Sequence, residues 1–188
     1  MSYPERLASK IVETLNTAAK DHLRGQWTTE LLKMLLCGVG KQEGLVVCAS
    51  GCEGADHGEW LYDMSWLDYG GKDAEYGLAN PEPGKGLYRD QVLALESEWR
   101  GTDGELESDF EKLVQARSAL RVMVFPVRQE RDAESTIRRL FLRDIKAFRR
   151  GQADDTYLFC AWIDQVSTVE FRHWVIRNTP PWALTPLP

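Results

Sequence analysis

The chain has 188 residues, of which 43% are hydrophobic and 28% are charged, and its formal net charge is -6. This composition excludes disordered and fibrous proteins, and the length is that of one medium domain. We therefore predict a single domain over residues 1–179, followed by a proline-rich tail over residues 180–188.

The first half of the chain is predicted to hold two helices, a short strand and a long β-hairpin. The predicted elements span Pro4–His22, 28–40, Leu45–Ala49, Trp60–Tyr69 and Leu87–Trp99. Thr28 or Thr29 is expected to cap the second helix, and Gly38 and Gly40 are expected to stop it. The segment Gly70–Gly86 is rich in glycine and proline and is expected to be the hairpin loop.

The second half alternates helices with strands. Hydrophobic spacing predicts helices over Glu105–Ala119 and Thr136–Arg150, and strands over Leu120–Val127, Tyr157–Ile163 and Thr168–Ile176. This order of elements predicts an α/β (α+β) protein with a mixed central β-sheet flanked by helices.

Three carboxylates are expected to converge on the predicted hairpin. Glu96 and Glu98 share one face of their strand, because side chains two residues apart point the same way. A symmetric hairpin places Asp63 near Ala94, within one or two positions of Glu96. Crowded carboxylates raise each other's pKa, and a hard cation such as Mg²⁺ or Mn²⁺ would offset that repulsion. The alternative is that all three are solvated residues on an exposed sheet face.

Several of these segments together resemble the core of the PD-(D/E)xK nuclease superfamily, which has the restriction-endonuclease-like fold. The resemblance covers roughly residues 63 to 127, and its segments are Trp60–Asp63, Leu93–Trp99, the helix that follows and Leu120–Phe125. It implies metal-dependent hydrolysis of phosphodiester bonds, in DNA more than in RNA. Asp63 and Glu96 would be metal ligands.

Glu98 occupies the position of the superfamily's lysine, so the chain resembles an ExE variant. It would be a further metal ligand or the base for the attacking water. The resemblance also suggests Lys112 as a lysine supplied from the neighbouring helix, and Glu13 as a glutamate from the first helix. Asp68 is a rival to Asp63. For Lys112, Glu13 and Asp68 the alternative is an ordinary surface or turn residue, and Ser65 is only a weak candidate to line the pocket.

The helix predicted over residues 136–150 is strongly basic. Its candidate phosphate-binding residues are Arg138, Arg139, Arg143 and Lys146. The alternative is a solvated amphipathic helix. Residues 51–111 hold 16 acids and 4 bases, whereas the rest of the chain holds 13 acids and 19 bases, so the net charge of -6 conceals a basic remainder.

The remaining expectations concern cysteines, partners and location. Cys48, Cys52 and His57 have an unusual spacing for zinc, so small buried cysteines are the alternative. The sequence shows no secretory signal and no apolar run long enough for a membrane span, which predicts a cytoplasmic protein. The rival to the nuclease hypothesis is a non-catalytic binding or regulatory protein that keeps the same fold and docks a protein partner.

Overall fold

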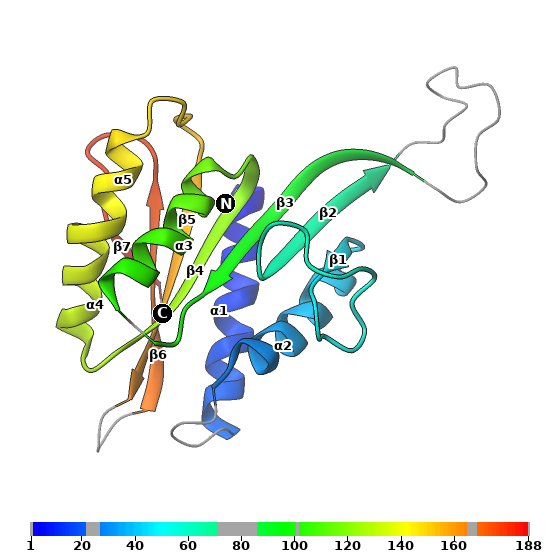
Figure 1. Cartoon of the computed structure of the whole chain (residues 1–188), viewed down its shortest axis with the longest axis horizontal. Coiled ribbons are helices and arrows are strands. Elements are labelled where there is room, and N and C mark those ends of the chain that lie inside the picture. Colours follow the sequence, from blue (N-terminus) through cyan, green and yellow to red (C-terminus); the bar gives the residue numbers. More distant parts are fainter. Residues whose placement is uncertain (1, 22–26, 71–85, 101, 165–168, 188) are drawn as a thin grey trace.

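A seven-stranded sheet forms the centre of the computed structural model, which describes residues 2–21, 27–70, 86–100, 102–164 and 169–187 (Figure 1). The strands follow one another in chain order across the sheet: β1 (Val46–Cys48), β2 (Met64–Gly70), β3 (Leu87–Ser97), β4 (Ser118–Val127), β5 (Thr156–Asp164), β6 (Val169–Arg177) and β7 (Thr185–Leu187). Strands β3, β4 and β5 are parallel, and the other pairs are antiparallel. The predicted boundaries at His22 and Thr168, and most of the predicted hairpin loop, lie outside the described residues.

Helices cover both faces of the sheet, which confirms the predicted mixed α/β arrangement. One face packs against α1 (Tyr3–Asp21) and α2 (Thr29–Gln42). The other packs against α3 (Asp103–Gln115), α4 (Glu130–Thr136), the π-helical turn η2 (Ile137–Phe141) and α5 (Leu142–Ala147). Each crossover between parallel strands is therefore helical, as parallel pairing requires. The β2–β3 pair extends beyond these layers in Figure 1.

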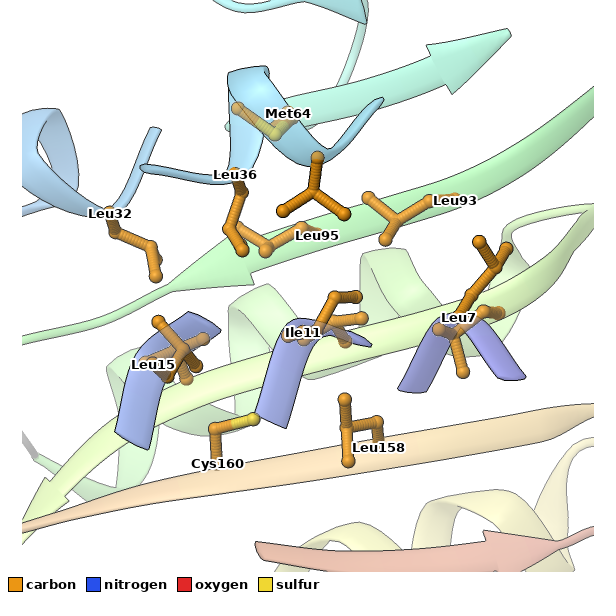
Figure 2. Packing of buried hydrophobic residues seen from close by; sticks show 14 of the residues in the cluster. Leu7, Ile11, Leu15, Leu32, Leu36, Met64, Leu93, Leu95, Leu158 and Cys160 are labelled. Carbon is orange, nitrogen blue, oxygen red and sulfur yellow. The ribbon is translucent and has the colours of Figure 1, made fainter. Parts of the chain in front are cut away.

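The α1 helix lies along the sheet because its apolar residues recur every four positions. Leu7, Ile11 and Leu15 are fully buried, and Figure 2 shows them pointing into one cluster with Leu36 and Leu95. Burying a leucine or isoleucine side chain contributes roughly 1.5 to 3 kcal/mol. This stripe fixes α1 against the middle of the sheet.

The α2 helix starts where the sequence predicts but ends later. The Thr28 hydroxyl accepts a hydrogen bond from the Leu31 amide, which confirms the predicted cap. The helix runs through both glycines to Gln42, so the predicted stop is wrong. A Cβ at Gly40 would lie 2.8 Å from atoms of Trp66. Gly40 therefore serves the close approach of the helix to the sheet rather than helix termination.

The basic helix is also longer than predicted, and it is not a regular α-helix. It begins at Glu130, six residues before the predicted start, and passes through the π-helical turn. Phe141 in that turn is fully buried and stacks on Phe159, with ring centroids 5.3 Å apart. The hydrophobic spacing located the buried face correctly, but it carried no signal for the irregular turn.

The proline-rich tail is part of the sheet in the structure. Thr185, Pro186 and Leu187 form β7, which pairs with β6, and Lys146 lies over the ring of Trp182. The predicted extended tail is therefore docked against the domain. Among the described residues, no helix combines the length and apolar character needed to cross a membrane.

Candidate functional site

Asp63 and Glu96 lie at the same end of the β2–β3 pair, and the charge of Asp63 acts on the Glu96 carboxyl group. Two β-bulges shift the register along this pair, so Met64 pairs with Leu95. Asp63 directly precedes Met64, and Glu96 directly follows Leu95. The symmetric hairpin placed Asp63 near Ala94 instead, because bulges leave no clear mark in the sequence.

Glu96 lies near the carboxyl end of β3, beside the parallel strand β4, where it pairs with Met123. The chain leaves β3 here and enters α3, which begins after the cap residue Thr102. In open sheets with parallel strands, ligands bind outside the carboxyl ends of those strands. The two carboxylates therefore occupy the part of the fold where a ligand site is expected.

The Glu96 carboxyl group is buried without full hydrogen bonding. The residue is 3% exposed, and its Oε1 atom has no hydrogen-bond partner. Lys112 Nζ lies 3.4 Å from Oε1 and forms an ion pair with it. Burial, followed by the charge of Asp63, raises the pKa of Glu96 to about 8, and Lys112 opposes this shift only in part. Glu96 is therefore mostly protonated at neutral pH.

Lys112 comes from α3 and is shared between two acids. Its Nζ donates a hydrogen bond of 2.7 Å to Asp109 and lies near Glu96. Burial acts to lower the pKa of Lys112, but the bond to Asp109 and the charge of Glu96 outweigh it and raise the pKa. The lysine singled out in the sequence thus lies beside the carboxylate pair as a stable cation.

Asp63 is held by the end of β3. Its Oδ2 atom accepts hydrogen bonds of 2.8 Å from both the amide and the hydroxyl of Ser97. The Ser97 hydroxyl also lies 2.9 Å from Thr29 Oγ1, which accepts a bond from the Trp99 ring nitrogen. The Asp63 Oδ1 atom lies 3.9 Å from Lys33 Nζ. One oxygen of Asp63 is therefore fixed, and the other lies toward a second lysine.

Lys33 is a site residue that the sequence analysis missed. Its side chain is almost fully buried, and Nζ donates to Glu59 Oε1 at 2.6 Å and to the Ser50 carbonyl at 3.4 Å. The signal was present in the sequence, because Lys33 is the one charged residue within the apolar run from Leu31 to Cys37. A charge in an apolar helical run indicates a buried ion pair.

The segment that delivers Asp63 carries backbone strain. Leu61 has φ of 81°, in the left-handed region that side chains other than glycine rarely adopt, and it is 78% exposed. Leu61 lies between Glu59 and Asp63, both of which contact Lys33 or lie close to it. Strain of this kind costs roughly 1 to 3 kcal/mol and is concentrated at functional sites.

Glu98 does not join the other two carboxylates. Its Oε1 atom accepts a hydrogen bond of 2.5 Å from the amide of Arg100, in the segment that leads from β3 to α3. Within the described part of the chain, no three His, Cys, Asp or Glu side chains gather closely enough to hold one metal ion. The predicted patch of three carboxylates is therefore not formed, and Asp63 and Glu96 remain as a pair.

The weaker candidates lie away from this pair or have structural roles. Glu13 is exposed on α1. Ser65 is fully buried, and its hydroxyl accepts a bond from Gln91. Asp68 pairs in register with Asp90 rather than with an arginine, and burial followed by the charge of Asp68 raises the pKa of Asp90.

The basic side chains of the η2–α5 region have partners within the chain. Arg139 forms two hydrogen bonds to Asp103, at 2.6 and 3.0 Å, and Arg143 pairs with Glu107. Arg138 lies 3.7 Å from Glu134. The pairs of Arg139 and Arg143 join the region to α3, and the three ion pairs together compensate much of its charge. Nucleic-acid binding by Arg138, Arg139, Arg143 and Lys146 stays a prediction.

The cysteine and histidine cluster has a backbone explanation. Cys48 and His57 form an isolated β-bridge, and Cys48 is buried. Among the residues that the structure describes, no group of three His, Cys, Asp or Glu side chains in this region could hold a metal ion. The geometry thus gives no support to the zinc alternative.

Comparisons with known proteins assign no family to the chain. No protein-family model matches it, and no curated protein does. One matching solved structure is a cysteine-to-alanine mutant of the Nesterenkonia AN1 amidase, from the nitrilase superfamily. The identity is 12%, the match covers 98% of this chain and 80% of that chain, and the TM-score is 0.37. A score this low transfers neither fold nor activity.

These findings correct the predicted membership of the PD-(D/E)xK superfamily and the predicted nuclease activity. No family model supports that resemblance, and the described residues do not form the carboxylate cluster that it implied. The physical reason lies in the brevity of the motif. A few acidic residues on two predicted strands can occur in unrelated mixed sheets, and here Glu98 turns to the Arg100 amide instead of joining the pair.

Proposed function

We propose that Asp63 and Glu96 form a divalent-cation centre, selective for Mg²⁺ or Mn²⁺, in an enzyme that uses a cation-bound water. The observation that carries the proposal is the Oε1 atom of Glu96, which is buried without a hydrogen bond at the carboxyl end of a parallel strand. A buried acceptor without a hydrogen bond is costly, and the ion pair with Lys112 at 3.4 Å offsets that cost only in part, so Oε1 retains capacity for a further partner.

The residues present fit a hard divalent cation. Mg²⁺ is commonly held by one or two carboxylates, with water and substrate completing its coordination. Asp63 and Glu96 supply two carboxylates on neighbouring segments, and Ser97 fixes the orientation of Asp63. A third protein ligand is not needed. When bound, the cation would act as a Lewis acid and lower the pKa of a coordinated water.

The chain's own residues provide the proton chemistry around that position. Glu96 holds a proton on its buried carboxyl group, and loss of this proton leaves a carboxylate next to the Lys112 ammonium. Lys112 therefore stabilises the charged form of Glu96 when the proton leaves. Asp109 keeps the lysine in place through its 2.7 Å hydrogen bond. Binding of the cation would displace the Glu96 proton, because a ligating carboxylate is deprotonated, so Glu96 would serve as a ligand and not as the general acid or base in the loaded site.

Isothermal titration calorimetry with MnCl₂ and MgCl₂ tests the centre. We expect saturable binding to the native chain. Because each of the two carboxylates supplies a ligand, Asp63→Asn and Glu96→Gln should each weaken binding at least about 10-fold, comparable to roughly 1.4 kcal/mol. Circular dichroism confirms that each variant is folded.

Glu98→Gln is the matched control, since it removes a neighbouring carboxylate that is bonded to the Arg100 amide. Its affinity for Mn²⁺ should equal that of the native chain. The proposal fails if the native chain shows no binding at millimolar cation, or if Glu98→Gln weakens binding as much as Glu96→Gln does.

A further inference from the structure

The loop between β1 and β2 places a second cysteine against α2. Cys37 is buried in α2, and Cys52 is half-buried in the loop. Cys52 packs against the hydrophobic cluster that contains Cys37, and after burial the neighbouring Cys52 thiol is the next cause that raises the pKa of Cys37. Residues 15 positions apart in sequence thus bring two sulfur atoms together on the α2 side of the sheet.

The loop is held at its ends and turns sharply near Cys52. The Val47 amide donates to Asp56 at 2.8 Å, and the Glu59 amide donates to the Ser50 hydroxyl at 2.9 Å. Gly51 and Gly54, which flank Cys52, both have positive φ. A Cβ placed on Gly54 would be 3.8 Å from Cys37 Sγ, so the turn lies directly over this thiol.

We propose that Cys37 and Cys52 form a reversible disulfide, which makes this pair a site of oxidative modification. The other two cysteines are unsuited to the role. Cys160 is fully buried in β5, and Cys48 is buried in β1, next to the His57 bridge. The proposal does not depend on a cation at Asp63 and Glu96.

Peroxide supplies the oxidant in the expected reaction. The more exposed Cys52 thiolate attacks one oxygen of hydrogen peroxide, the O–O bond breaks, and Cys52 becomes a sulfenic acid as hydroxide leaves. Cys37 sulfur then attacks Cys52 sulfur, the S–S bond forms and water leaves. In total two thiols lose two electrons and two protons, and one peroxide is reduced to two waters.

Formation of this disulfide would also restrict the loop that carries Glu59, the ion-pair partner of Lys33. Lys33 and Cys37 are four residues apart on α2, so they share one face of the helix. Both face the same loop, because Lys33 contacts Ser50 and Glu59 while the turn at Gly54 lies over the Cys37 thiol. A disulfide would fix the loop to α2 and with it the Glu59 side of the Lys33 ion pair.

Peptide mapping tests the proposal. The native chain is treated with hydrogen peroxide at low molar excess, free thiols are blocked, and tryptic peptides are compared with and without dithiothreitol. Trypsin separates Cys37, in peptide 34–41, from Cys48 and Cys52, in peptide 42–72. We expect these two peptides to be linked and two hydrogens lighter than their sum, and dithiothreitol to release them.

Two serine variants identify the partner. Cys52→Ser should abolish the linked species, whereas Cys48→Ser should leave it unchanged, and the oxidised native chain should unfold at a higher urea concentration than the reduced chain. A link that survives in Cys52→Ser, a disulfide between two chains, or oxidation of Cys52 to a sulfinic acid without any link would each overturn the proposal. Circular dichroism shows whether the variants fold.

Discussion

Two charged side chains are buried in neighbouring strands of the sheet, and their surroundings differ. Arg121 on β4 is 4% exposed and Glu96 on β3 is 3% exposed. The Arg121 guanidinium donates to the carbonyls of Ala116 and Ser118, and its Nη2 atom lies 2.9 Å from Asp155. Glu96 has one oxygen without a hydrogen bond. The arginine makes several hydrogen bonds within the chain, whereas Oε1 of the glutamate has only the ion pair with Lys112 at 3.4 Å.

This difference in hydrogen bonding indicates that Arg121 stabilises the fold and that Glu96 is available to bind a ligand. A buried group that is fully bonded connects its neighbours, and removing it leaves them without partners. A buried group with an open bonding position costs stability, and it persists where function uses that position. On this basis Arg121 is structural, and Glu96 is the centre of the candidate site.

The largest expected effect on the free energy of unfolding comes from replacing Arg121. Arg121→Met should lower the free energy of unfolding by about 3 to 5 kcal/mol, because it leaves the largely buried Asp155 carboxylate uncompensated. Urea denaturation followed by circular dichroism measures the loss. Arg139→Ala is the control, since its pair with Asp103 is exposed and should contribute less than about 1 kcal/mol. Equal losses in the two variants would contradict a structural role for Arg121.

Replacing Glu96 is expected to raise the free energy of unfolding at pH 8, whereas replacing Arg121 lowers it. The pKa of Glu96 is raised from 4.5 to about 8 by folding, so the stability contributed by its protonated form is fully present below about pH 4.5 and is lost as pH rises to about 8. The loss across this window is on the order of 4 kcal/mol. Glu96→Gln keeps a neutral side chain, so it should be more stable than the native chain at pH 8 and similar to it at pH 4.5.

Urea denaturation of both chains between pH 4.5 and 8.5 measures this window. Burial lowers the pKa of His173 to about 4, so its contribution to stability rises with pH between about 4 and 6.5. That contribution is common to both chains and cancels in their difference. A difference that stays constant with pH would show that the Glu96 carboxyl group is not perturbed by folding.

The sequence was sufficient for most of the architecture, because helical and strand periodicity report directly on burial. The apolar stripe of α1 and the run that became β4 illustrate this. Features that depend on contacts between distant segments were not predicted. Gly40 was interpreted as a helix stop because its contact with Trp66 arises only on folding.

The candidate site was predictable in its residues more than in its geometry. Asp63 and Glu96 stood out by residue type and spacing, and Lys112 only through the resemblance to the nuclease core. The bulges that align Asp63 with Glu96 lie in β2 and β3 without a sequence signal. Lys33 was overlooked because a helix pattern does not show what faces a charged position. Its partner Glu59 comes from a loop whose path no periodicity describes.

A bound cation should reduce the difference between Glu96 and Arg121, because it supplies the partner that the Glu96 oxygen lacks. Saturating Mn²⁺ would give the open oxygen of Glu96 a partner and raise the free energy of unfolding by about 2.7 kcal/mol at roughly 100 times the dissociation constant. Thermal unfolding with and without MnCl₂ at pH 8 measures this gain. Glu96→Gln should gain much less, whereas Glu98→Gln should gain as much as the native chain. A gain of the same size in Glu96→Gln would place the cation elsewhere.

The smallest effect concerns the backbone strain at Leu61, which precedes Asp63 by two residues. Because glycine adopts positive φ without steric cost, Leu61→Gly should be more stable than Leu61→Ala by about 1 kcal/mol, although it also makes the unfolded chain more flexible. Leu61→Ala retains the strain, and the side chain it shortens is largely exposed, so it is the matched comparison. If the strained turn holds Asp63 in place, Leu61→Gly should also bind Mn²⁺ more weakly than Leu61→Ala. A glycine variant that is less stable than the alanine variant would contradict backbone strain at Leu61. The segment that leads to Asp63 would then store no strain near Glu96.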